Sequence, residues 1–141
     1  MLAMCAAVLA LASCGTTKDV PRASPSTGIA SSTASPAHSR LVGPSEFATA
    51  VAEPTRLTIN VHVPYEGDIP GTDLSIPFDQ IAQQTARLPA ERSTPLAIYC
   101  RSGPMSATAA AELSALGYTD VVELRGGMRA WQASGRSLAT S

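Results

Sequence analysis

The sequence predicts an α/β domain in which a mainly parallel sheet of about four or five strands carries helices on both faces. Two observations support this prediction. Short apolar, β-branched runs alternate along the chain with amphipathic or alanine-rich segments, which is the order that βαβ units require. A cysteine, Cys100, stands between an apolar run and an alanine-rich one. That order places it on a loop between the carboxyl end of a strand and the start of a helix, the sheet edge where ligands bind.

The first predicted elements surround a short helix. Leu41-Val42 predicts a short edge strand, and Pro44 opens a helix with an acidic residue near its start and Phe47 on its buried side. Pro54 ends that helix, since proline lacks an N–H and clashes with the preceding turn. The β-branched residues 57–61 then predict the central strand of the sheet.

The middle of the chain predicts a loop, an edge strand and a second helix. Residues 62–73 are rich in proline and glycine and predict a loop. Ile76-Pro77 predicts a very short edge strand, because proline is excluded from central strands. From Phe78 to Leu88 the apolar residues recur on one helical face, which predicts an amphipathic helix.

The last third of the chain contains the cysteine loop. An apolar strand over residues 96–99 leads to Cys100, and a helix follows over residues 106–116 with Gly117 as its C-terminal cap. The remaining predicted elements are a strand over residues 121–124, a Gly126-Gly127 turn, and a helix over residues 128–134 around a core Trp131.

The first 14 residues form an apolar segment that ends in a cysteine. Met1 to Ala12 is too short for a membrane span of about 20 residues but suits the core of a signal peptide. The run Leu11-Ala12-Ser13-Cys14-Gly15 resembles the lipobox of bacterial lipoproteins, which implies lipidation of Cys14. The alternative is a signal-like run with a coincidental cysteine. The segment lacks the usual preceding basic residues, which we attribute to a start codon assigned too far downstream.

A tether and a domain follow this segment. Residues 15–39 are rich in Ser, Thr, Ala and Pro and lack apolar periodicity, so we expect a disordered tether. Residues 40–141 form the predicted domain. If Cys14 is lipidated, we expect the domain outside the cytoplasm, held at the cell membrane by the lipid anchor only. The formal net charge of −1 shows no electrostatic footprint for a nucleic acid.

Several motifs then follow one another in the order found in one family. They are Ile69-Pro70-Gly71 with the later Ile76-Pro77, the loop Cys100-Arg101-Ser102-Gly103, and the closing Gly126-Gly127 with Trp131. Together they resemble a single rhodanese-like domain, the fold of sulfurtransferases. The resemblance covers residues 40–138.

The resemblance implies a chemistry for the loop. In that family a cysteine thiolate takes the outer sulfur of an anionic donor such as thiosulfate, and the persulfide passes to cyanide or a small thiol. Cys100 is the implied nucleophile, and a helix N-terminus with its free N–H groups favours a thiolate there. We expect no cofactor, and no metal site, because His62 is the only histidine of residues 40–141. The implied substrate-binding loop comprises Arg101, Ser102, Gly103, Pro104, Met105 and Ser106.

Two loop positions depart from the family pattern. Met105 stands where many members have an arginine, so one anion-binding charge is absent. Pro104 lacks an N–H and removes one possible donor to the sulfur. Upstream, Asn60 and His62 replace an aspartate and an arginine, and we expect them to keep a neutral hydrogen bond. These departures leave the sulfur donor open.

Three functions are compatible with the predicted fold, and the loop residues argue against the third. The first is a membrane-tethered, extracytoplasmic sulfurtransferase, acting as a monomer on a small sulfur-containing anion. The second is a non-catalytic module that binds a small anion or a partner, or that serves in thiol redox or sulfur signalling. The third, a phosphatase or arsenate reductase, needs a roomier loop closed by an arginine, and Met105 and Ser106 supply none.

Overall fold

Strand β4 lies at the middle of a five-stranded sheet of order β1-β5-β4-β2-β3, in which every neighbouring pair is parallel. The computed structural model describes residues 39–139. The predicted α/β class with a parallel sheet is confirmed. The strands are β1 Arg40–Val42, β2 Leu57–Asn60, β3 Leu74–Ser75, β4 Leu96–Tyr99 and β5 Val121–Leu124, and the α-helices are α1 Pro44–Val51, α2 Pro104–Ala115 and α3 Gly127–Ala133.

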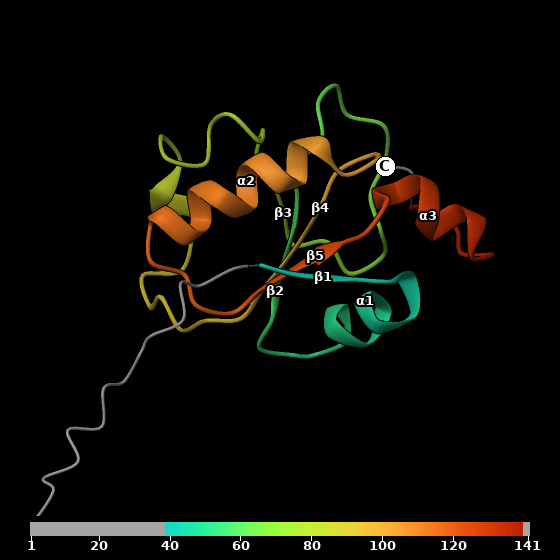
Figure 1. Ribbon diagram of the computed structural model, residues 1–141, viewed down its shortest axis with the longest axis horizontal. Helices are drawn as coiled ribbons and strands as arrows, with labels where there is room; N and C mark the ends of the chain where they lie inside the picture. Colours follow the sequence, from blue (N-terminus) through green and yellow to red (C-terminus); the bar gives the residue numbers. More distant parts are fainter. Residues whose placement is uncertain (1–38, 140–141) are drawn as a thin grey trace, which may run out of the picture. The chain divides into compact units, whose positions relative to one another are not determined.

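Helices cover both faces of the sheet, as predicted, with α1 and α2 on opposite sides (Figure 1). Side chains alternate between the faces along a strand. Leu96, Ile98 and Cys100 therefore join the cluster under α2. Ala97 and Tyr99 join the cluster under α1 and α3. The two core clusters thus meet along β4, and Cys100 belongs to the α2 side.

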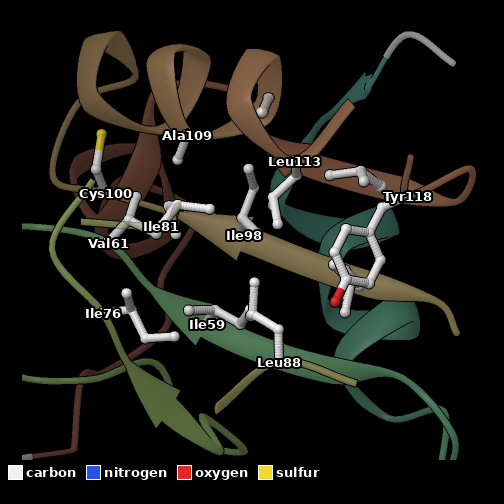
Figure 2. Close-up of a cluster of buried hydrophobic side chains, with 13 residues drawn as sticks. Ile59, Val61, Ile76, Ile81, Leu88, Ile98, Cys100, Ala109, Leu113 and Tyr118 are labelled. Atoms are coloured by element: carbon white, nitrogen blue, oxygen red, sulfur yellow. The ribbon is translucent and has the colours of Figure 1, made fainter. Parts of the chain in front are cut away.

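The cluster under α2 is largely aliphatic. Ile59, Ile98 and Leu113 are fully buried in it, and each such side chain contributes about 1.5–3 kcal/mol when removed from water. Figure 2 shows Cys100 at one end of this cluster, near α2, and Tyr118 at the other end. The thiol is therefore part of the core edge and not of an exposed loop tip.

The opposite cluster is built on aromatic rings. Phe47 of α1 packs edge-to-face on Tyr99, with ring centroids 6.1 Å apart, and on Trp131 of α3, with centroids 6.5 Å apart. Such pairs add about 0.5–1.5 kcal/mol beyond the area they bury. Trp131 is 6% exposed, which confirms its predicted place in the core.

The order and bounds of two strands differ from the prediction. β2 was expected at the centre, but it lies beside the edge strand β3, and β4 occupies the middle. β3 covers Leu74–Ser75, two residues before the predicted Ile76-Pro77 pair. Ile76 still donates its N–H to the carbonyl of Asn60 at 3.0 Å, but its fully buried side chain belongs to the core.

The prediction of a helix from Phe78 to Leu88 is wrong. This segment is a series of turns with one 3-10 turn over Thr85–Arg87. Ile81 and Leu88 are buried, as the pattern required, but Ala82 is exposed. A short segment gains little from helix propagation alone, so the burial of two separated side chains fixes its path.

Helix α2 begins earlier than predicted. It starts at Pro104, after an N-cap Gly103 with φ +119°, and not at Ser106. Proline suits the first helical position, where its missing N–H has no intrahelical partner to lose. Ser106 therefore lies inside the first turn and does not cap the helix. Gly117, with φ +91°, follows the C-cap as predicted.

Several predictions fall outside the described residues. They concern the signal segment with Cys14 and the tether up to residue 38. Within residues 39–139, no helix has the length and apolar character needed to cross a membrane.

Candidate active site

Cys100 directly follows β4, at the carboxyl end of the middle strand. Cys100 is only 1% exposed. The thiol is the one free cysteine of residues 39–139. A buried thiol at the ligand-binding edge of a parallel sheet is accessible only to a small reactant or after a side chain above it moves.

The loop after β4 folds back over the sulfur. The N–H of Gly103 donates to Sγ of Cys100 at 3.0 Å, and the hydroxyl oxygen of Ser106 lies 3.5 Å from Sγ. The backbone N–H groups of Ser102 and Ser106 also point to it as donors. The φ of +119° at Gly103 is accessible to glycine at no steric cost. The loop therefore surrounds the sulfur with N–H donors, as expected of a thiolate site.

Two effects of opposite sign act on the pKa of Cys100. Burial raises it, because the charged form is less well solvated. Hydrogen bonds from the Ser106 hydroxyl and from the N–H groups of Ser106, Gly103 and Ser102 lower it and outweigh the burial, so the pKa of Cys100 is below its ordinary value. The loop thus favours the nucleophilic thiolate despite its small exposure.

The start of α3 holds the cysteine loop in place. The N–H of Met128 donates to the carbonyl of Cys100 at 2.9 Å, and that of Arg129 donates to the carbonyl of Arg101 at 3.0 Å. Gly127 has φ +57°, and a Cβ there would lie 2.2 Å from the Cys100 carbonyl oxygen. The Gly126-Gly127 motif therefore permits a close backbone contact that sets the position of Cys100.

A chain of side chains crosses the mouth of the loop. Arg101 pairs with one carboxylate oxygen of Glu66 at 2.5 Å. The other oxygen lies 3.1 Å from Nε2 of His62, and Nδ1 of His62 lies 3.4 Å from the sulfur of Met105. His62 is therefore a structural, hydrogen-bonded residue at the end of β2, as predicted. Met105 packs against the cluster that contains Cys100, so it forms an apolar wall at this position.

A surface pocket of about 340 Å³ lies beside this chain of contacts. Arg101 and Arg129 both line it, together with Gln132. Arg129 is exposed and makes no ion pair within residues 39–139. Glu66 lines the pocket too and pairs with Arg101, so Arg129 is the cationic group of this pocket that remains to attract a small anion.

The upstream Asn60 keeps a neutral hydrogen bond to His62, but through the backbone. The N–H of His62 donates to the amide oxygen of Asn60 at 2.9 Å. The amide nitrogen of Asn60 donates to Asp68 at 2.9 Å and to the carbonyl of Gly67 at 3.1 Å. Asn60 therefore ties the loop after β2 to the strand, and His62 is left to contact Glu66 and Met105.

Sequence reasoning missed three side chains near the loop. Glu66 and Arg129 carried no signal, because a charged residue on a loop or an exposed helix face is ordinary. Glu123 did carry one, since it interrupts the apolar run of β5, and it is 6% exposed. Its carboxylate accepts a hydrogen bond from the Ser106 hydroxyl at 2.7 Å. Within residues 39–139, no three His, Cys, Asp or Glu side chains are arranged to hold a metal ion.

Known proteins resemble this chain in sequence and structure. Residues 58–134 match the family described as the rhodanese-like domain. A sulfurtransferase of Allochromatium vinosum is 38% identical over 82 residues, which cover 56% of this chain and 74% of the relative.

Two solved structures share the fold. A rhodanese-related protein of Thermoplasma volcanium has a TM-score of 0.61 at 25% identity, covering 72% of this chain and 99% of that one. A rhodanese-like domain protein of Staphylococcus aureus has a TM-score of 0.57 at 27% identity, with the same coverage of 72% and 99%.

Proposed function

Because the chain belongs to the rhodanese-like domain family and is homologous to sulfurtransferases, we propose that Cys100 carries sulfane sulfur as a persulfide. One observation carries this proposal. The sulfur of Cys100 accepts from loop N–H donors such as that of Gly103 at 3.0 Å, it lies 3.5 Å from the Ser106 hydroxyl oxygen, and its pKa is lowered although it is buried. A core cysteine with a structural role would need none of these donors.

The proposed reaction has two displacement steps. The Cys100 thiolate attacks the outer sulfur of thiosulfate, the S–S bond of the donor breaks, and sulfite leaves with the electron pair. Cyanide or a small thiolate then attacks the outer sulfur of the Cys100 persulfide, and the thiolate is regenerated. The N–H groups that stabilise the thiolate in this loop are also suited to the persulfide anion, so the same donors serve both steps.

The choice of an anionic donor is supported by the charges beside the loop. Arg101 lines the neighbouring pocket together with its ion-pair partner Glu66. Arg129, which makes no ion pair among residues 39–139, lines it as well. Met105 offers no charge, so the anion meets these arginines rather than a residue at the start of α2. We propose that a small sulfur-containing anion is the donor, that cyanide or a thiol is the acceptor, and that the chain acts as a monomer.

Steady-state turnover tests the proposal. The full chain is incubated with thiosulfate and cyanide, and thiocyanate formation is followed. We expect turnover in the wild type and none in Cys100→Ser. Cys5→Ser is the matched control, because it makes the same chemical change at another thiol and should leave turnover intact.

The alternative function is a non-catalytic module for a small anion. The near-complete burial of Cys100 favours it, because a buried sulfur is less accessible to a donor. Binding of thiosulfate or sulfite, measured by calorimetry, without any thiocyanate formation would support this alternative. Turnover that depends on Cys100 would exclude it.

We also propose that the protein is lipid-anchored outside the cytoplasm. The support is the sequence Leu11-Ala12-Ser13-Cys14-Gly15 after an apolar run. Cys14→Ala should move the protein from the membrane fraction to the soluble fraction, whereas Cys5→Ala should not. Membrane association that survives Cys14→Ala would contradict the proposed anchor.

A further inference from the structure

Glu123 is a buried acid in a strand that is otherwise apolar. It lies in β5, next to the middle strand, with only 6% exposure. No ion pair with it occurs among residues 39–139. Its hydrogen-bond partner among these residues is the Ser106 hydroxyl, 2.7 Å from Oε1. A buried carboxylate that depends on one hydroxyl for its hydrogen bond is costly, which points to a role for the contact.

Ser106 connects Glu123 to the reactive sulfur. Its Oγ lies 2.7 Å from Glu123 Oε1, 2.8 Å from the Gly103 carbonyl oxygen and 3.5 Å from Cys100 Sγ. A serine hydroxyl has one proton to donate and lone pairs to accept with. Glu123, the Gly103 carbonyl and the Cys100 sulfur therefore compete for the hydroxyl hydrogen of Ser106, which can be donated to only one of them at a time.

The direction of that proton decides which form of Cys100 is favoured. When Ser106 donates to Glu123, its oxygen can only accept from the Cys100 thiol, which favours the neutral S–H. When Ser106 donates to sulfur, it favours the thiolate, but the buried carboxylate loses its donor. A negative charge at Glu123 also opposes a second negative charge at Cys100.

Glu123 is also among the residues that line a second pocket. This pocket of about 380 Å³ is lined by Glu123, by Arg125 and by loop residues 102–104. Arg125 is the second charged group of that pocket, and its guanidinium donates to the carbonyl of Leu41 at 3.4 Å. The contacts of Glu123 and the lining of this pocket thus include two other titratable or charged groups, Cys100 across Ser106 and Arg125 across the pocket.

We propose that Glu123 is a positioning residue that competes with the Cys100 sulfur for the hydroxyl proton of Ser106 and so restrains the reactivity of the thiol. This inference rests on Cys100 being the reactive thiol of the proposed function. The Glu123 carboxylate is then a hydrogen-bond acceptor beside the loop that withdraws the Ser106 hydroxyl from the sulfur.

The pH dependence of Cys100 alkylation tests the proposal. The full chain is treated with iodoacetamide over a range of pH, and modification of the Cys100 peptide is quantified by mass spectrometry. Glu123→Gln removes the charge, and its amide can donate to Ser106, which frees the hydroxyl for sulfur. We expect the pH at which alkylation of Cys100 reaches half of its plateau rate, the alkylation midpoint, to fall by about one pH unit. Below the wild-type midpoint, the alkylation rate should be about tenfold higher. An unchanged or raised midpoint would overturn the proposal.

Two further variants separate the hydroxyl from charge and folding. Ser106→Ala should raise the midpoint, and Glu123→Gln in that background should shift it by less than half as much, because the shared proton is gone. An equal shift in both backgrounds would contradict competition through Ser106. Glu123→Asp keeps the charge but withdraws the carboxylate from Ser106, so it should lower the alkylation midpoint by less than Glu123→Gln does. A raised midpoint in Glu123→Asp would contradict the proposal.

Alkylation needs no sulfur donor, so this test is independent of turnover. A chain that alkylates as expected but forms no thiocyanate would retain the role of Glu123 and reject the proposed enzyme. A chain that turns over thiosulfate without the expected shift in Glu123→Gln would do the reverse.

Discussion

Tyr99 and Cys100 are neighbours in the chain, yet they lie on opposite faces of the sheet and behave in opposite ways. Burial raises the pKa of both side chains. For Tyr99, burial and the carboxylate of Asp68 outweigh the hydrogen bonds from Thr72 and Ile69, and the pKa stays far above its ordinary value. For Cys100, donors from the loop outweigh burial, and the pKa falls.

The difference shows that the hydrogen-bond partners of a buried group, and not its degree of burial, decide whether its charged form is favoured. The Tyr99 hydroxyl donates to Asp68 at 3.2 Å and accepts the N–H of Ile69 at 3.0 Å, which keeps it neutral and ties the loop before β3 to the sheet. Within residues 39–139, Cys100 has N–H donors and no carboxylate hydrogen-bonded to it. One face of β4 is therefore stabilised for structure, and the other is prepared for a thiolate.

Gly127→Ala should disrupt the Cys100 side most strongly. The added Cβ would meet the Cys100 carbonyl oxygen at 2.2 Å, so the loop must shift. We expect thiocyanate turnover to fall about a hundredfold, the usual cost of misplacing a reacting group by about 1 Å. Gly135→Ala is the matched control, since Gly135 also has a positive φ but nothing lies within 4 Å of its added Cβ. Equal losses in both variants would refute the backbone contact as the cause.

Tyr99→Phe should affect the other face and leave the thiol alone. It removes the hydroxyl that bonds Ile69 and Asp68, so we expect unfolding to cost about 1–3 kcal/mol less. The free energy of unfolding in urea and the alkylation midpoint of Cys100 are measured together. Tyr65→Phe, at a residue that is 51% exposed, should change stability much less. A moved Cys100 midpoint would show that the two faces are coupled.

The pH profile of the wild type tests the Cys100 half of the comparison. Alkylation needs the thiolate, so its rate rises with pH and reaches half of its plateau at the pKa. Because the pKa of Cys100 is lowered, we expect that midpoint below the midpoint of a free cysteine peptide measured in the same way. A midpoint above that of a free cysteine would mean that burial prevails at Cys100 as it does at Tyr99.

Met105→Arg should have the smallest effect. It restores a charge at the start of α2, where the packing of Met105 leaves an apolar wall. An exposed charge of this kind contributes about 0.2–1 kcal/mol, so we expect the KM for thiosulfate to fall up to about fivefold. Met105→Gln, which is similar in size but neutral, is the control. An equal change in both variants would show that access, and not charge, limits the donor.

Local pattern was sufficient to predict most of the fold. The alternation of apolar and helical segments identified the parallel sheet, and the Cys100 loop was placed at the correct edge. The order of strands was harder to predict, because pairing between distant segments depends on contacts that no local window contains. The helix expected over residues 78–88 failed for a related reason: Ile81 and Leu88 could be buried without a regular helix.

The candidate site was predictable only where a residue stands on the loop itself. Cys100, Gly103 and Ser106 come from one short stretch, and the structure brings them together. Glu66 and Glu123 reach the loop from other parts of the chain. The place of Ser106 also differs from the prediction: α2 starts at Pro104 and not at Ser106, and Ser106 connects the sulfur with a buried acid.

Sulfur loading in a single turnover tests the central claim most directly. The full chain is incubated with thiosulfate or a polysulfide, and the mass of the Cys100 peptide is measured before and after cyanide is added. We predict a gain of one sulfur atom on Cys100, its loss to cyanide as thiocyanate, and neither event in Cys100→Ser. A Cys100 peptide that stays unmodified with every donor, while the protein remains folded, would contradict the assignment of Cys100 as a persulfide carrier.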